Sequence, residues 1–133
     1  MADYFVSSSL GSDSTGAGTA ANPWKTIEKA IGAAPAIALP GAGPTRLALR
    51  GGDTFGEAVA PTLSPTAAKP LEILGDVDGA LFAAAGGSPG VGVPTWRSWS
   101  NSTTVLTDPC VYLNGRGYVA LRKIRFVGGS FGS

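Results

Sequence analysis

The chain has 133 residues, a net charge of +1 and no histidine, and it is 44% hydrophobic but only 14% charged. A nearly neutral chain has no overall field that would recruit nucleic acid or an anionic membrane, and the lack of histidine removes the commonest general base and metal ligand. The 20 glycines and 10 prolines predict many turns between short elements, in a chain with enough apolar residues for a core. We expect one domain, residues 1–133, without a cofactor or a metal.

The clearest local signal is a helix within residues 21–35, which read ANPWKTIEKAIGAAP. Asn22 or Thr26 can cap its first turn, and Pro35 ends it. At helical spacing, one face of this segment is apolar, and it consists of Ile27, Ala30, Ile31 and Ala34. An amphipathic helix ahead of a body of strands predicts a lid on one end of that body.

The segment ahead of the helix contains a short β-prone run at residues 4–6 and a small polar loop at residues 11–19. Residues 1–35 are therefore expected to form an N-terminal strand, a loop and the covering helix. Residues 36–133 are expected to form the strand body, with a loop around residues 83–102, where small residues dominate.

Short β-prone runs separated by glycine- and proline-containing turns follow the helix. In residues 46–50, the strand period places Leu47 and Leu49 inward and two arginines outward. The other runs are residues 54–55, 71–74, 81–82, 103–106, 111–113, 118–121 and 124–127. Runs this short are typical of solenoid rungs, and their spacing fits coils of about 20–24 residues. The sequence predicts an all-β solenoid, with an antiparallel β-sandwich or jelly roll as the alternative.

An aromatic cluster in a polar stretch is the candidate site for binding a ligand or partner, and its residues are Trp96, Arg97 and Trp99. Exposed indole faces stack on sugar rings or fill pockets on protein partners, and tryptophan and arginine often dominate binding energy. The alternative is that both indoles fold back onto the strands and join the core.

A local group of basic residues is the second candidate for a partner surface, and it consists of Arg116, Arg122, Lys123 and Arg125. Such a group can meet an acidic partner. The alternative is a solvated face, because the chain as a whole is nearly neutral.

Three aspartates lie in turn sequences. Asp76 and Asp78 have the Asp-x-Asp-Gly pattern that starts some calcium loops, but the later acids of such a loop are missing. Asp53 follows two glycines, where an aspartate side chain commonly accepts hydrogen bonds within a tight turn. We interpret all three as turn residues and predict no metal site.

Carboxylate pairs for catalysis are only weakly indicated. A glycosidase needs two carboxylates that flank the bond, and Glu57 with Glu72 is the conceivable pair. A β-elimination lyase would instead need a basic residue beside an acid, such as Arg50 with Glu72 or Asp76. Neither arrangement rises above chance, so we assign no catalytic residue.

Two parts of the chain, about residues 3–57 and 111–129, carry a family resemblance. The motifs YFVSSS, NPWKTIEKAIGAA and LALRGGDTF, with the later VYLNGRGYVALRKIRFVGG, resemble right-handed parallel β-helix proteins of the pectate-lyase-like superfamily. The resemblance implies a short right-handed parallel β-helix with an N-terminal capping helix. Members of that superfamily include polysaccharide lyases and glycosidases, and also phage tail spikes, tail fibres and other virion proteins.

The resemblance and the composition together lead us to expect a non-enzymatic structural protein of a phage virion, as a tail fibre or tail spike module or a capsid decoration. The start of the chain lacks the pattern of a signal peptide, so we expect synthesis in the host cytoplasm and assembly into the virion. No capping helix follows the last strands, which predicts that a partner covers that end or that further coils follow.

The expected partners are other virion proteins and further copies of the chain, with a trimer favoured, and a surface glycan is a further expected ligand. Neither nucleic acid nor membrane insertion is expected. The alternative functions are a polysaccharide lyase or glycoside hydrolase and a carbohydrate-binding module.

Overall fold

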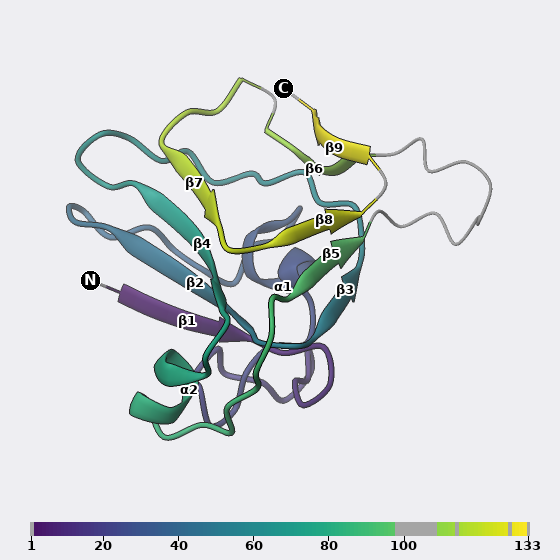
Figure 1. Ribbon diagram of the computed structural model, residues 1–133. Coiled ribbons are helices and arrows are strands. Elements are labelled where there is room, and N and C mark those ends of the chain that lie inside the picture. The colour runs from purple at the N-terminus through teal and green to yellow at the C-terminus, as the bar shows by residue number, and fades with distance from the viewer. Residues whose placement is uncertain (1, 98–108, 114, 128, 133) are drawn as a thin grey trace.

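The protein is built from three parallel sheets and two short helices (Figure 1), in a computed structural model that describes residues 2–97, 109–113, 115–127 and 129–132. The sheets have the strand orders β1-β2-β4-β7, β3-β5-β8 and β6-β9. The strands are β1 (Ala2–Val6), β2 (Thr45–Arg50), β3 (Thr54–Gly56), β4 (Leu71–Asp76), β5 (Thr95–Arg97), β6 (Pro109–Tyr112), β7 (Val119–Arg122), β8 (Arg125–Val127) and β9 (Gly129–Gly132). The helices are α1 (Ile27–Ile31) and α2 (Ala80–Ala84).

Neighbouring strands within each sheet are far apart in sequence, because the chain passes through α1 between β1 and β2 and through another sheet between the other neighbours. After β2 the chain turns into β3, and after β7 it turns at Lys123 into β8. Parallel neighbours need such long connections, since a tight hairpin joins only antiparallel strands. The register stacks like residues, so that Leu47 of β2 aligns with Tyr4 of β1 and Ile73 of β4.

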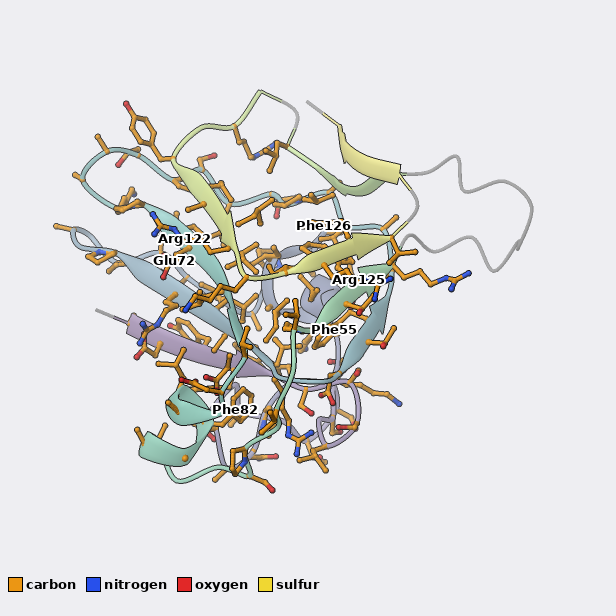
Figure 2. All side chains as sticks on the ribbon, viewed as in Figure 1. Phe55, Glu72, Phe82, Arg122, Arg125 and Phe126 are labelled. Atoms are coloured by element: carbon orange, nitrogen blue, oxygen red, sulfur yellow. The ribbon has the colours of Figure 1, made fainter. Side chains whose placement is uncertain are left out.

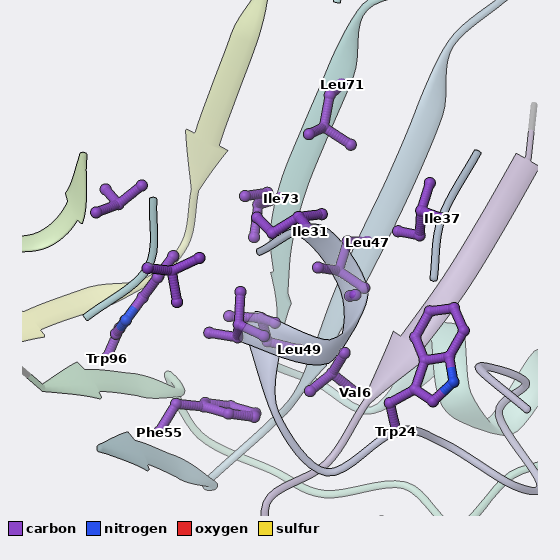
Figure 3. Packing of buried hydrophobic residues seen from close by; sticks show 14 residues of the cluster. Val6, Trp24, Ile31, Ile37, Leu47, Leu49, Phe55, Leu71, Ile73 and Trp96 are labelled. Carbon is purple, nitrogen blue, oxygen red and sulfur yellow. The ribbon is translucent and has the colours of Figure 1, made fainter. Parts of the chain in front are cut away.

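The inward side chains of these strands form one central apolar cluster (Figure 3). Leu47 and Leu49 are fully buried, as their alternation predicted. Ile73 is equally buried one strand further along, and Phe55 contributes from the second sheet. Each fully buried side chain of this size stabilises the fold by about 1.5–3 kcal/mol relative to an exposed one.

The observed architecture corrects the predicted fold class. Parallel sheets of four and three strands combine with α1 and α2 into an α/β mix, not an all-β solenoid. An antiparallel sandwich or jelly roll is also wrong, because every pair of named strands in the described residues is parallel. Strand periodicity does not report which strands pair, because pairing joins residues that are far apart in sequence, and only the family resemblance implied the parallel direction.

Helix α1 is shorter than the sequence predicted. It begins after Thr26, whose side chain accepts a hydrogen bond from the Lys29 backbone N–H, and it ends before Gly32. Ile27 and Ile31 are fully buried in the central cluster, as their spacing predicted. Ala34 lies beyond the helix and is exposed, so it does not belong to the buried face.

Helix α2 occupies residues predicted as the strand 81–82. The Asp76 carboxylate accepts hydrogen bonds from the backbone N–H groups of Leu81 and Phe82 at 3.1 and 2.9 Å. Gly79, with a φ of 77°, supplies the left-handed turn ahead of the helix. The Phe82 ring then packs edge-on against Phe5 on the outer face of the first sheet, with ring centroids 5.0 Å apart. The alanine-rich segment favours a helix once Asp76 satisfies its first N–H groups.

The remaining predicted strands have mixed outcomes. The runs predicted at residues 111–113, 118–121 and 124–127 correspond to β6, β7 and β8 with shifted ends. The run predicted at 103–106 lies outside the described residues. Strand β5 lies inside the stretch that was predicted as a loop around 83–102.

Candidate interaction surface

Strands β7 and β8 each form one edge of the two larger sheets (Figure 1). The candidate interaction surface lies along these two strands, which we call the layer of β7 and β8. Four inward side chains of β7, β8 and the corner between them pack against the central cluster but stay only partly buried: Val119, Leu121, Ile124 and Phe126. One strand further in, Leu71 and Ile73 are 1% and 0% exposed. The apolar column of the core therefore continues into this layer without being closed over by another described strand.

The backbone of β7 offers unpaired groups at its outer edge. The Leu71 N–H donates to the Tyr118 carbonyl at 3.0 Å, which directs Tyr118 and Ala120 toward β4. Residues of a parallel strand alternate between their two neighbours, so the N–H and C=O groups of Val119 and Leu121 point away from β4. No strand pairs with them there within the described residues.

The opposite edge of the same sheet is covered. The Phe5 N–H of β1 donates to the Gly18 carbonyl at 2.9 Å, and the Phe5 carbonyl accepts from the Trp24 N–H at 3.2 Å. The Tyr4 and Trp24 rings also stack, with centroids 5.6 Å apart. Within the described chain, β7 is thus the edge of this sheet that offers room for another strand.

Charge sets the layer of β7 and β8 apart from the rest of the chain. Residues 109–133 contain four arginine or lysine residues and no aspartate or glutamate. The whole chain has a net charge of +1, so residues 1–108 carry a net charge of −3. Three residues of the predicted basic group, Arg122, Lys123 and Arg125, therefore lie in the layer that has the open strand edge.

The four basic side chains of this group have different environments. The Arg116 Nε–H donates to the Leu63 carbonyl at 2.8 Å, which uses part of its guanidinium inside the protein. Arg122 pairs with Glu72 at 3.2 Å (Figure 2). Lys123 and Arg125 are exposed at and just after the corner between β7 and β8. The structure thus brings Arg122, Lys123 and Arg125 to the open layer and holds Arg116 by a backbone contact.

Charges of alternating sign cross the outer face of the first sheet. The Arg46 guanidinium of β2 pairs with Asp3 of β1 at 3.0 Å, and Arg122 of β7 pairs with Glu72 of β4. Arg46 also aligns with Glu72 in the register of β2 and β4. From β1 to β7 the strands therefore contribute Asp3, Arg46, Glu72 and Arg122, which alternate in charge.

A hollow of about 320 Å³ lies at the start of β2, β4 and β7, and Tyr118 lines it. Tyr118 is 61% exposed, and its φ of 58° lies in the left-handed region that non-glycine residues seldom adopt. The other residues around the hollow include Pro44, Pro70, Arg46, Glu72 and Arg122. The sequence analysis placed Tyr118 at the start of the predicted strand 118–121 and gave it no role, whereas the structure places it just before β7, beside this hollow.

The tryptophan prediction is corrected by the burial of Trp96. This side chain is 0% exposed, and its Nε1–H donates to the Glu57 carbonyl at 2.9 Å. It aligns with Phe55 and Phe126 in the second sheet, so its ring takes the inward position of β5. A buried indole cannot offer its face to a sugar or a partner. Arg97 is half-buried at the end of β5, and Trp99 lies outside the described residues.

Asp53 joins two distant turns through its buried carboxylate. It accepts hydrogen bonds from the hydroxyls of Ser7 and Ser9 at 2.6 and 2.8 Å. Arg50 also pairs with it at 3.3 Å. The Asp53 carboxylate accepts hydrogen bonds, but its partners are the Arg50 side chain and two serines of the segment after β1, not the backbone of its own turn as predicted.

Glu57 lies under the first turn of α1. Its carboxylate accepts hydrogen bonds from the backbone N–H groups of Ile27 and Glu28 at 2.9 and 2.8 Å. Burial raises the pKa of the Glu57 carboxyl to about 7, although both of these N–H groups favour its ionised form. The Glu57 carboxylate therefore has a structural role, because it binds the first backbone N–H groups of α1.

The pairs considered for catalysis have other partners in the structure. Glu57 holds α1, whereas Glu72 pairs with Arg122 on the outer face of the first sheet. Arg50 aligns with Asp76 across β2 and β4, but its guanidinium binds Asp53 and the carbonyls of residues 88 and 89. Asp76 holds α2, and Asp78 accepts from the Ala80 N–H at 3.1 Å, which confirms the turn interpretation of both.

The described residues contain no group of three His, Cys, Asp or Glu side chains that could hold a metal ion. None of the helices among them is long and apolar enough to cross a membrane.

Comparisons with protein-family models, with curated proteins and with solved structures find no match for this chain. The resemblance to the pectate-lyase-like superfamily therefore stays a prediction from the sequence.

Proposed function

We propose that this protein is a non-enzymatic structural module that joins a larger protein assembly through the open layer of β7 and β8. The observation that carries the proposal is the outer edge of β7, where the backbone groups of Val119 and Leu121 face no described strand. Unpaired strand edges are templates for pairing with another chain, and proteins usually cover or charge them. The half-buried side chains beneath this edge would gain apolar contacts when a partner covers them.

The assembly that the sequence resemblance favours is a phage virion. Such a module would belong either to a tail fibre or tail spike or to the surface of the phage head. Other virion proteins are then the partners, and a trimer of identical chains is the second form of assembly. The cation-rich layer supports a protein partner, because a charged rim directs association and selects the partner.

Measurement of the native mass, alone and after co-expression with the products of the neighbouring reading frames, tests this proposal. Leu121→Pro removes the N–H that faces the open edge, whereas Leu121→Ala shortens the same side chain and keeps that N–H. We expect the wild-type protein and Leu121→Ala to enter a complex and Leu121→Pro to stay out of it. A folded wild-type protein that remains at 13.3 kDa in both preparations would overturn the proposal.

A further inference from the structure

The open edge of β7 combines three properties that together describe the strand it fits. Its backbone groups are available at Val119 and Leu121, and its inward side chains are apolar. Its outward side carries Arg122, and Lys123 and Arg125 are exposed next along the chain, at the corner and in β8. We propose that the strand that pairs with β7 belongs to a different chain and alternates apolar residues with acidic ones. This inference rests on the proposed function and names the chemistry of the partner.

The apolar half of the pattern follows from the inward side of β7. Val119 and Leu121 pack on the core and remain partly buried. A strand added beside β7 alternates its side chains between the same two faces as β7 does. Its inward residues would therefore lie next to Val119 and Leu121, where apolar side chains gain most and charged ones would be desolvated.

The acidic half follows from the outward side. The first sheet already alternates in sign from strand to strand, through Asp3, Arg46, Glu72 and Arg122. The next position in this series lies beside Arg122, which is 66% exposed and keeps guanidinium donors that Glu72 does not use. Lys123 and Arg125 are exposed close by in sequence. Opposite charges beside each other across neighbouring strands are favourable, and like charges are not.

A second copy of this chain fits the edge poorly. Two copies that met through this layer would bring together two surfaces that each carry Arg122, Lys123 and Arg125, and residues 109–133 contain no acid to pair with them. The stretch of the chain that comes nearest to an alternation of apolar and acidic residues is 71–78. Most of that stretch forms β4, which is paired with β2 on one side and with β7 on the other. No other stretch within residues 1–133 offers this alternation, and the proposal places the strand on a different chain.

Synthetic peptides test this inference on the whole protein. The probe is a fluorescent, end-capped peptide of alternating glutamate and valine, and the comparison peptide has lysine in place of glutamate. Binding is followed by fluorescence anisotropy at low and high salt. We expect the glutamate peptide to bind and the lysine peptide not to bind, and we expect salt to weaken the complex because the rim charges are screened.

Matched variants separate charge from strand pairing. Lys123→Glu with Arg125→Glu should weaken binding by about tenfold at low salt, whereas Lys25→Glu with Lys69→Glu, which has the same net charge, should change it by less than about twofold. Leu121→Pro should abolish binding that Leu121→Ala retains. Circular dichroism of each variant confirms that it is folded.

The outcomes distinguish this inference from the proposed function. Equal binding of both peptides, or no binding of the glutamate peptide, overturns the inference that the partner strand is acidic. A wild-type homo-oligomer that excludes the peptide also overturns it, because a second copy then occupies the edge, while the structural role in an assembly stands. Peptide binding by a protein that enters no assembly supports the acidic strand and overturns the proposed function.

Discussion

Glu57 Oε2 accepts a hydrogen bond from the backbone N–H of Ile27 at 2.9 Å, so a residue that follows β3 holds the first turn of α1. Ile27 itself is fully buried in the central cluster. One carboxylate therefore couples the position of the helix to the sheet on which it packs. The backbone carbonyl of Glu57 extends this link to Trp96 of β5.

The Glu57 carboxyl should make stability depend on pH. Its pKa rises from an ordinary value of 4.5 to about 7 on folding, mainly because burial removes it from water. Between these two values the native state binds a proton that the unfolded state does not, so the free energy of unfolding should fall as pH rises from about 4.5 to about 7, by on the order of 2 kcal/mol. Urea denaturation of the wild type and Glu57→Gln over this range measures the difference. If both proteins show the same pH dependence, the titration of Glu57 does not contribute.

The buried face of α1 should not accept a charge. Ile31→Asp places a carboxylate among apolar side chains and is expected to lower the free energy of unfolding by several kcal/mol, on the order of 3–5. Ala34→Asp is the control, because Ala34 is exposed just beyond the helix. Thermal melting followed by circular dichroism compares the two. Similar melting temperatures would show that α1 does not pack in the core.

Trp96 should contribute to stability and not to ligand binding. Trp96→Ala leaves a cavity beside Phe126, whose ring centroid lies 5.7 Å from that of Trp96, and it removes the hydrogen bond to the Glu57 carbonyl. We expect a loss of about 3–5 kcal/mol in the free energy of unfolding. Chemical denaturation measures it, and the emission of the wild-type protein provides a second readout. A variant of unchanged stability would place the indole outside the core.

The Asp53 carboxylate should also be structural. Asp53→Asn keeps the shape of the side chain but loses the charge that faces Arg50 and two serine hydroxyls. Because these groups are buried or partly buried, we expect a loss of about 1–3 kcal/mol. Asp78→Asn, at an exposed turn position, should cost less than about 1 kcal/mol. Denaturation midpoints of both variants at one pH decide the matter, and equal midpoints would contradict the assigned role of Asp53.

Local patterns in the sequence determined several elements correctly. The alternation in residues 46–50 predicted that Leu47 and Leu49 are buried, and helical spacing predicted the same for Ile27 and Ile31. Thr26 was one of the two predicted caps, and it is the one that caps α1. These predictions succeed because periodicity and capping depend on residues within a few positions of each other.

Tertiary structure decided the rest. The parallel order of the sheets, the helix at residues 80–84 and the burial of Trp96 depend on contacts between residues that are far apart in sequence. Glu57 under α1 and Asp53 beside Ser7 are further examples, since their partners lie 30 and 46 residues away. The basic residues of the last third were visible in the sequence, but only strand pairing shows that Arg122 belongs to an open edge. Local sequence patterns therefore determine which side chains of an element are buried. The free energy of packing determines which elements pair and pack together. The interaction surface depends on that pairing, because it lies along the outer edge of β7.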